Sequence, residues 1–189
     1  MTSTPKMKPW IDAIHAYTPG KSKLDGIAEP VKLSSNENPL GPSPKAIAAM
    51  GAIAGQAHRY PDGASVALRE AIADLHGLEA DRIVCGTGSD EILQLLALAY
   101  ASVGDEVLFA RNSFMVYPIA ARRAGATPVE AADSDYAADV DALLAAVTER
   151  TRIVYLANPN NPTGTLISGA EVRRLHAGLR SDIVFVYDA

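Results

Sequence analysis

Three short segments of the chain place polar residues directly behind runs of apolar, β-branched residues. They are GTGSDE (residues 86–91), NPNNPTG (158–164) and the single carboxylate of Asp188. Glycine turns at helix starts hold anions, side-chain amides donate to ligand oxygens, and carboxylates pair with protonated nitrogens. Together these residue types suit the binding of a phosphorylated pyridine ring.

The first segment combines a glycine turn with the expected start of an apolar helix. Gly86 and Gly88 allow the backbone to turn tightly and to approach a ligand closely. The helix start at Ser89 offers free N–H groups, the positive end of the helix dipole and one hydroxyl, which is a site for a phosphate. The structural alternative is a plain turn with Thr87 or Ser89 as the N-cap.

A dinucleotide site fits this segment poorly. Its fingerprint needs a third glycine where Glu91 stands, and a strand ending in an acid about 20 residues further on. A single phosphate is therefore the better ligand. Since a carboxylate repels a phosphate, we expect Asp90 to turn away from the site and to cap the helix.

The other two segments supply a carboxylate and an amide. A carboxylate behind the apolar run IVFVY needs a cationic partner if it is buried, so Asp188 is either an exposed loop residue or the counter-ion of a ring N–H⁺ or a metal. In the second segment Asn161 is the best-placed donor, because the neighbouring prolines fix the backbone. One isolated Asn-Pro pair would indicate only a turn.

The elements that must position these residues alternate between short apolar strands and helices. Such alternation indicates βαβ crossovers, a mostly parallel sheet and an α/β fold. The carboxyl ends of parallel strands share one edge of the sheet, where ligands bind, so the three segments should meet. The expected strands are 82–86, 106–110, 127–132, 152–157 and 182–189, and the expected helices are 44–55, 65–77, 89–102, 114–125, 139–147 and 168–179.

The first 45 residues differ from the rest in composition. They are rich in proline, glycine and serine and show little periodicity, which indicates extended segments and turns. An irregular stretch of this length is typically functional or bound to a partner. We therefore predict an N-terminal arm over residues 1–45 and a ligand-binding domain over residues 46–189.

Bulk composition narrows the class of protein. Of the 189 residues 48% are hydrophobic and 21% are charged, and the net charge of −5 argues against a nucleic-acid surface. There is no apolar run long enough for a membrane span and no apolar leader. One cysteine and four scattered histidines favour a reducing compartment and no metal site. We expect a cytoplasmic protein.

Several motifs resemble one enzyme family. NPNNPTG resembles the signature loop of the fold-type-I aminotransferases, which use pyridoxal phosphate; GTGSDE resembles their phosphate turn, and VYDA the strand that carries their ring-binding aspartate. SSNENPLGPSPKA, RYPDG and GTGSDEIL together resemble the histidinol-phosphate aminotransferase subfamily. The similarity runs from Tyr17 to Ala189. It implies a three-layer αβα large domain, truncated, with an irregular N-terminal arm.

The resemblance also implies roles for matching residues. Asp188 would contact the pyridine nitrogen and Asn161 the phenolic oxygen of the cofactor, while Phe114 would stack on its ring unless it is a core aromatic. Tyr60 would reach the phosphate in a neighbouring subunit, which implies a homodimer, unless it is a surface tyrosine. The phosphate would be held by Gly88, Ser89 and Asp90, and the substrate side would be lined by Asn36, Glu37 and Tyr17.

The implied reaction moves an amino group between histidinol phosphate and 2-oxoglutarate in histidine biosynthesis. Alternatives are an aromatic-amino-acid aminotransferase or a threonine-phosphate decarboxylase of the same fold, a non-catalytic fragment, and a nucleotide-binding domain. In the family the Schiff-base lysine lies beyond the aspartate that matches Asp188. All six lysines of this chain lie at or before Lys45. The chain thus resembles the N-terminal half of such an enzyme and is not expected to transaminate by itself.

Overall fold

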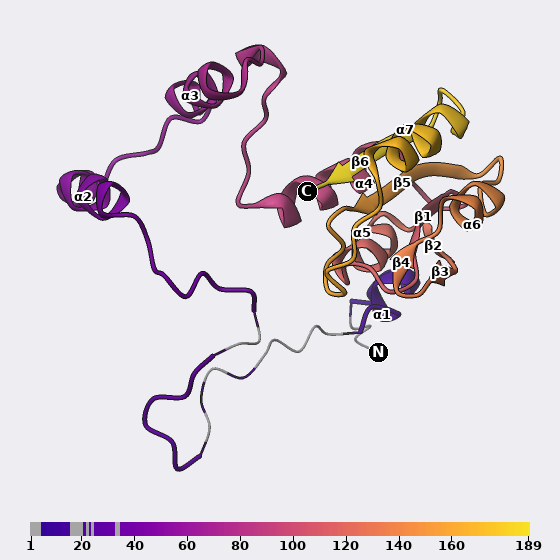
Figure 1. Ribbon diagram of the computed structural model, residues 1–189, viewed down its shortest axis with the longest axis horizontal. Coiled ribbons are helices and arrows are strands. Elements are labelled where there is room, and N and C mark those ends of the chain that lie inside the picture. Colours follow the sequence, from indigo (N-terminus) through magenta and orange to yellow (C-terminus); the bar gives the residue numbers. More distant parts are fainter. Residues whose placement is uncertain (1–4, 16–20, 22, 24, 33–34) are drawn as a thin grey trace. The chain divides into compact units, whose positions relative to one another are not determined.

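The structure is a computed structural model that describes residues 5–15, 21, 23, 25–32 and 35–189 (Figure 1). The chain divides into two compact units. The larger unit comprises Met1–His15 and Cys85–Ala189, and the smaller one comprises Ala16–Val84.

A parallel sheet forms the centre of the larger unit. Its four strands are β1 (Glu106–Ala110), β2 (Thr127–Ala131), β5 (Thr151–Ala157) and β6 (Val184–Asp188), in the order β2-β1-β5-β6. Each neighbouring pair is parallel, which confirms the predicted sheet. All of β1 and nearly all of β5 are buried, as expected for strands that are covered on both faces.

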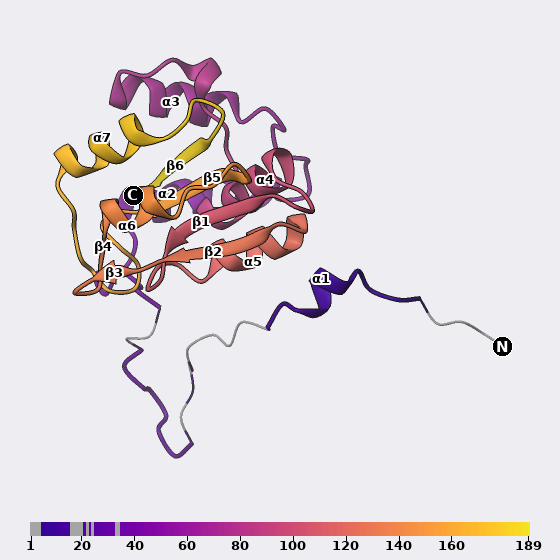
Figure 2. The same cartoon turned by 90° about the vertical axis from the view of Figure 1, so that its right-hand side faces the viewer.

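Helices cover both faces of this sheet. Helices α4 (Ser89–Tyr100) and α5 (Val116–Ala124) lie on one side of the strands, and α6 (Val140–Ala145) and α7 (Gly169–Gly178) on the other (Figure 2). Because successive strand residues point to opposite faces, β1, β5 and β6 each contribute to two cores. One core joins Leu93, Ala97, Val107, Phe109, Tyr117, Ile153 and Tyr155, and the other joins Leu108, Leu143, Val154, Leu156 and Leu175.

Local sequence signals explain where these helices begin and end. Ser168 accepts a hydrogen bond from the N–H of Glu171, and Asp139 accepts one from Ala142, so each caps its helix as such residues commonly do. Gly125, with a φ of 84°, ends α5 in the left-handed conformation that favours glycine. Helix α5 begins at Val116, two residues later than predicted.

The predicted strand at residues 82–86 is wrong. A 3₁₀ turn, η2 (Ala80–Arg82), occupies its beginning. Ile83 is extended, but residues 83–86 pair with no strand in the described part of the chain. A strand exists only through hydrogen bonds to a neighbour, and an apolar run does not reveal whether that neighbour is present. The half-buried Cys85 therefore does not lie in a strand.

Two small elements of the larger unit were not predicted. A hairpin joins β3 (Asp133–Ser134) to β4 (Ala137–Ala138) through Asp135 and Tyr136, whose φ angles of 49° and 61° are both left-handed. The chain uses Asp-Tyr where such turns favour Asn-Gly, so the sequence signal was weak. The other element, α1 (Pro9–Asp12), places Trp10 so close to Gly125 that an added Cβ would lie 3.3 Å from its ring.

The smaller unit contains the two helices predicted there, α2 (Pro44–Ile53) and α3 (Val66–His76), with the 3₁₀ turn η1 (Ala54–Gln56) following α2. The carboxylate of Asp62 accepts hydrogen bonds from the N–H groups of Val66 and Ala64, which lower its pKa. No helix in the described ranges is long and apolar enough to cross a membrane.

Candidate active site

The second and third polar segments meet at one edge of the sheet. The last residue of β5, Ala157, pairs with Asp188, the last residue of β6. Directly beyond this pair, the N–H of Asn158 donates to the carbonyl oxygen of Asp188 at 2.9 Å. The Asn-Pro loop and the Asp188 carboxylate therefore leave the sheet side by side, as the parallel topology predicted.

The Asp188 carboxylate has one hydrogen-bond partner among the described residues. The hydroxyl of Tyr117 donates to Asp188 Oδ2 at 2.7 Å. Burial raises the pKa of the Tyr117 hydroxyl well above its usual value, and the bond to Asp188 raises it further, so Tyr117 stays a neutral donor. Asp188 is only half-buried, and its Oδ1 remains open to a second donor.

An aromatic cluster links Phe114 to this carboxylate. The rings of Phe114 and Tyr117 meet edge to face, with centroids 5.9 Å apart at 88°. Phe114 is half-buried and packs against the core, so it is part of the core and also lies next to the residue that binds Asp188. Tyr117 was not predicted from the sequence, although its spacing of three from Phe114 within the predicted helix was a signal that the two share one side.

Two asparagines of the Asn-Pro loop are structural. Asn158, 4% exposed, accepts from the N–H of Ile167 at 2.9 Å and donates to the carbonyl of the same residue at 3.2 Å. The hydroxyl of Tyr187 in turn donates to the carbonyl of Asn158 at 2.9 Å. The side chain of the equally buried Asn160 donates to the carbonyl of Asn112 at 2.8 Å.

The third asparagine differs from the other two. Asn161 is exposed, and its side chain makes no hydrogen bond with any described residue. The loop around it is held by the turn between β3 and β4, because the hydroxyls of Thr163 and Thr165 both donate to the carbonyl of Tyr136, at 3.0 and 2.9 Å. Among the three asparagines, Asn161 is thus the one whose amide can reach a ligand.

The glycine turn begins α4 as expected, but no side chain caps the helix, and Glu91 instead binds Thr87 before the helix start. Gly88 has a φ of 80°, and Ser89 is the first helical residue. The N–H and the hydroxyl of Thr87 both donate to Glu91 Oε2, at 2.6 and 3.0 Å. The prediction that Asp90 caps the helix is wrong: its Oδ1 accepts from Gln94 Nε2 at 2.7 Å. The longer Glu91 side chain reaches back to the turn, whereas Asp90 meets its neighbour one helical turn further on.

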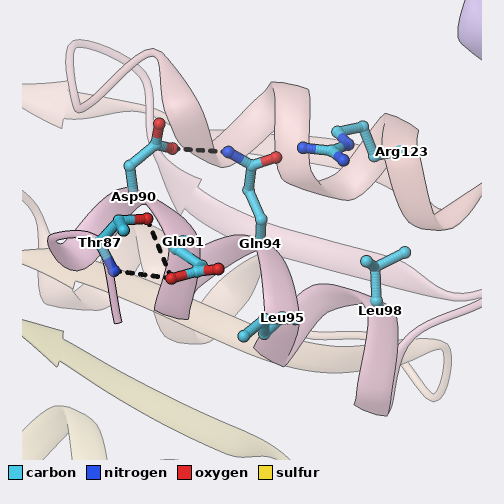
Figure 3. A pocket seen from close by; sticks show the side chains of 7 residues that line it. All are labelled: Thr87, Asp90, Glu91, Gln94, Leu95, Leu98 and Arg123. Carbon is cyan, nitrogen blue, oxygen red and sulfur yellow. Dashed lines mark hydrogen bonds between the residues drawn. The ribbon is translucent and has the colours of Figure 1, made fainter. Parts of the chain in front are cut away.

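A shallow hollow lies beside this turn (Figure 3). Its lining includes the carboxylates of Asp90 and Glu91, and the arginine Arg123 from α5. Ser89, Asn161 and Asp188 do not line it. Since two carboxylates repel an anion, we do not assign the phosphate to this hollow.

The Thr87–Glu91 contact should make the glycine turn sensitive to acid. The two bonds from Thr87 lower the pKa of Glu91 below its ordinary value of 4.5. An acid whose pKa is lowered by folding stabilises the folded state at pH values above its pKa in the unfolded chain. This contribution is lost as the pH falls through its pKa in the folded chain. We expect the protection of the Thr87 amide against hydrogen exchange to fall below pH 4.5. In Glu91→Gln this pH dependence should vanish; an identical profile in that variant would contradict the assignment.

Four of the predicted residues are not tested by this arrangement. Tyr60 and Asn36 belong to the smaller unit, where Tyr60 is fully exposed. Glu37, the neighbour of Asn36, pairs with Lys32 Nζ at 2.6 Å. Tyr17 lies outside the described residues. The roles expected for these residues stay predictions.

Comparison with known proteins finds aminotransferases, both by family model and by sequence identity. The family model described as aminotransferase class I and II matches residues 28–188. A histidinol-phosphate aminotransferase of Erythrobacter litoralis is 61% identical over 184 residues, which is 97% of this chain and 50% of the relative. The chain spans about half the length of the curated relatives it matches.

Two solved structures are also similar. A putative histidinol-phosphate aminotransferase from Erwinia carotovora atroseptica is 31% identical with a TM-score of 0.79, over 92% of this chain and 50% of that one. The histidinol-phosphate aminotransferase of Sinorhizobium meliloti, solved in complex with pyridoxal-5'-phosphate, has a TM-score of 0.83 at 23% identity, over 98% of this chain and 51% of that one. At that identity the second likeness supports the fold alone.

Proposed function

Because the chain belongs to the class I and II aminotransferase family, we propose that it forms the N-terminal half of an enzyme that moves an amino group between histidinol phosphate and 2-oxoglutarate, a step of histidine biosynthesis. The observation that carries this proposal is the 61% identity with the Erythrobacter enzyme over 97% of the chain. An identity this high over nearly every residue supports a shared substrate as well as a shared fold.

We propose pyridoxal phosphate as the cofactor, because the available donors and acceptors match its polar groups. Asp188 has one carboxylate oxygen open for a ring N–H. The Asn161 amide has no hydrogen-bond partner among the described residues, so it can bind the cofactor without breaking an existing hydrogen bond. Phe114 offers an aromatic ring that packs against Tyr117, the residue bound to Asp188. The start of α4, with Gly88, Ser89 and the N–H of Asp90, suits the phosphate.

When bound, pyridoxal phosphate supplies an electron sink for negative charge that develops on the substrate's α-carbon. The residues of this chain then have separate tasks. Asp188 would accept the ring N–H and keep the nitrogen protonated, Asn161 would donate to the phenolic oxygen, and Phe114 would pack on the ring face. Proton transfer at the substrate needs a lysine, and no lysine follows Lys45 in this chain. The chain alone is therefore expected to bind the cofactor without transaminating.

The remaining assignments belong to the same proposal. Tyr60 would contact the phosphate bound by a second subunit, so the active enzyme would be a homodimer. We place this enzyme in the cytoplasm. Asn36 and Tyr17 would border the substrate. Residues 1–45 would form the arm, and residues 46–189 would form the part of the large domain that holds the cofactor.

A chimeric enzyme tests the proposed function. In it, this chain replaces the matching half of the Erythrobacter enzyme, to which it is 61% identical. We expect glutamate to form from histidinol phosphate and 2-oxoglutarate within about tenfold of the parent rate, an allowance of about 1.4 kcal/mol in the barrier. Phenylalanine as the amino donor and decarboxylation of threonine phosphate test the sibling activities. A folded chimera without aminotransferase activity would refute the proposal.

A further inference from the structure

We propose that Tyr117 is the positioning residue for the Asp188 carboxylate, and that one buried tyrosine thereby orients both the carboxylate and the aromatic face of the site. This inference rests on the proposed function, because it concerns the two groups that would contact the cofactor ring. The sequence motifs do not include Tyr117, which lies 71 residues before Asp188 in the chain.

Tyr117 is itself held with little freedom. Its side chain is fully buried. Its ring stacks on that of Tyr155, with centroids 4.7 Å apart and an angle of 8° between the ring planes. The centroid of the Phe109 ring lies 6.0 Å away. Close-packed aromatic rings occupy one rotamer, so the hydroxyl points in a fixed direction.

The Asp188 carboxylate has no comparable support of its own. It stands at the end of β6, which pairs with β5 as its one neighbour in the described sheet. The terminal torsion of an aspartate is broad, so the carboxylate can rotate unless a partner holds it. The Tyr117 hydroxyl, 2.7 Å from Oδ2, supplies that hold and leaves Oδ1 for the ligand. The same ring also meets the ring of Phe114 edge to face.

A hydroxyl deletion separates this role from simple packing. Tyr117→Phe keeps the ring and removes the donor. The matched control is Tyr155→Phe: Tyr155 is equally buried and stacks on Tyr117, but its hydroxyl donates to the carbonyl of Leu93 at 2.6 Å. The probe is 4'-deoxypyridoxine 5'-phosphate, which lacks the aldehyde and so cannot react with the six lysines. Its Kd for the 189-residue chain is measured by calorimetry.

The decisive measurement is a double-mutant cycle with Asp188→Ala. If Tyr117 acts through the carboxylate, Tyr117→Phe raises the Kd about tenfold when Asp188 is present, as expected for a charge-assisted hydrogen bond, and has no effect in the Asp188→Ala chain. A packing role would raise the Kd by the same factor in both backgrounds. We expect this second pattern, with a smaller factor, for Tyr155→Phe.

The outcomes distinguish the two proposals. If the unaltered chain does not bind the probe, the proposed cofactor site of this chain fails, whereas the proposed function is tested by the chimeric enzyme. If it binds and Tyr117→Phe has equal effects in both backgrounds, or none, the positioning role of Tyr117 is overturned. Near-ultraviolet circular dichroism checks that each variant is folded. Should Tyr117→Phe not fold, 3-fluorotyrosine at position 117 keeps the ring and strengthens the donor; the Kd must then fall only when Asp188 is present, and an equal change in both backgrounds overturns the inference.

Discussion

Replacing Asp188 by alanine is expected to lower kcat/KM of the chimeric enzyme for histidinol phosphate by about 10²–10³-fold, the usual effect of removing one preorganised electrostatic group. Without the carboxylate, the ring nitrogen loses the group that keeps it protonated, and the electron sink weakens. Both kcat and kcat/KM should fall, because the contact matters most when charge develops on the substrate. Glutamate formation in the steady state measures the effect.

The matched control for this prediction is Asp182→Ala. Asp182 is an exposed acid near the start of β6, at the end of the sheet opposite to the carboxyl ends of the strands. Its carboxylate pairs there with Arg180 and Arg152. Exposed ion pairs contribute little to stability, so kcat/KM should stay within about twofold of the chimera's value. Equal losses in the two variants would mean that the fall at Asp188 reflects damage to the strand and not chemistry.

The second large effect concerns stability. Leu108→Ala is expected to lower the free energy of unfolding by about 2–5 kcal/mol, through lost burial and the cavity that remains. Leu108 is fully buried in β1, between β2 and β5, and packs in the core that includes Leu143 and Val154. Urea unfolding can be followed by fluorescence of Trp10, the one tryptophan of the sequence, which lies against Gly125 in the same unit.

Leu98→Ala is the control for Leu108→Ala. It makes the same chemical change at a side chain that is 51% exposed on α4. Since less apolar surface leaves water there on folding, the loss should be below about 1 kcal/mol. The dependence of the unfolding free energy on urea should be unchanged in both variants. Similar losses at the two positions would contradict the description of Leu108 as a core residue.

The sequence predicted the fold well where each element has a pattern of its own. The apolar runs at β1, β5 and β6 and the helices α4, α6 and α7 could be predicted because the hydrophobic period, and for α6 and α7 the N-cap, are local properties. The failure at residues 82–86 and the omission of the β3–β4 hairpin have a common cause. Whether an extended segment becomes a strand depends on a partner elsewhere, and a two-residue strand has no measurable period.

The candidate site was predictable where it follows from the order of the strands, and not where it depends on a tertiary side-chain contact. The meeting of Asp188 with the Asn-Pro loop followed from parallel topology alone, and the contrast between Asp90 and Glu91 depends on one methylene group. Tyr117 was missed because its role is a tertiary contact, and an aromatic residue in an apolar helix carries no sign of what its hydroxyl binds.

The β3–β4 turn has a consequence for which substitutions the Asn-Pro loop can tolerate. The acceptor that anchors Thr163 and Thr165 is the backbone carbonyl of Tyr136, which every amino acid supplies. What the loop requires at positions 135 and 136 is therefore a left-handed conformation and not a particular side chain. Asparagine or glycine would keep the anchor, whereas proline, whose φ is locked near −65°, would turn the oxygen away from both threonines.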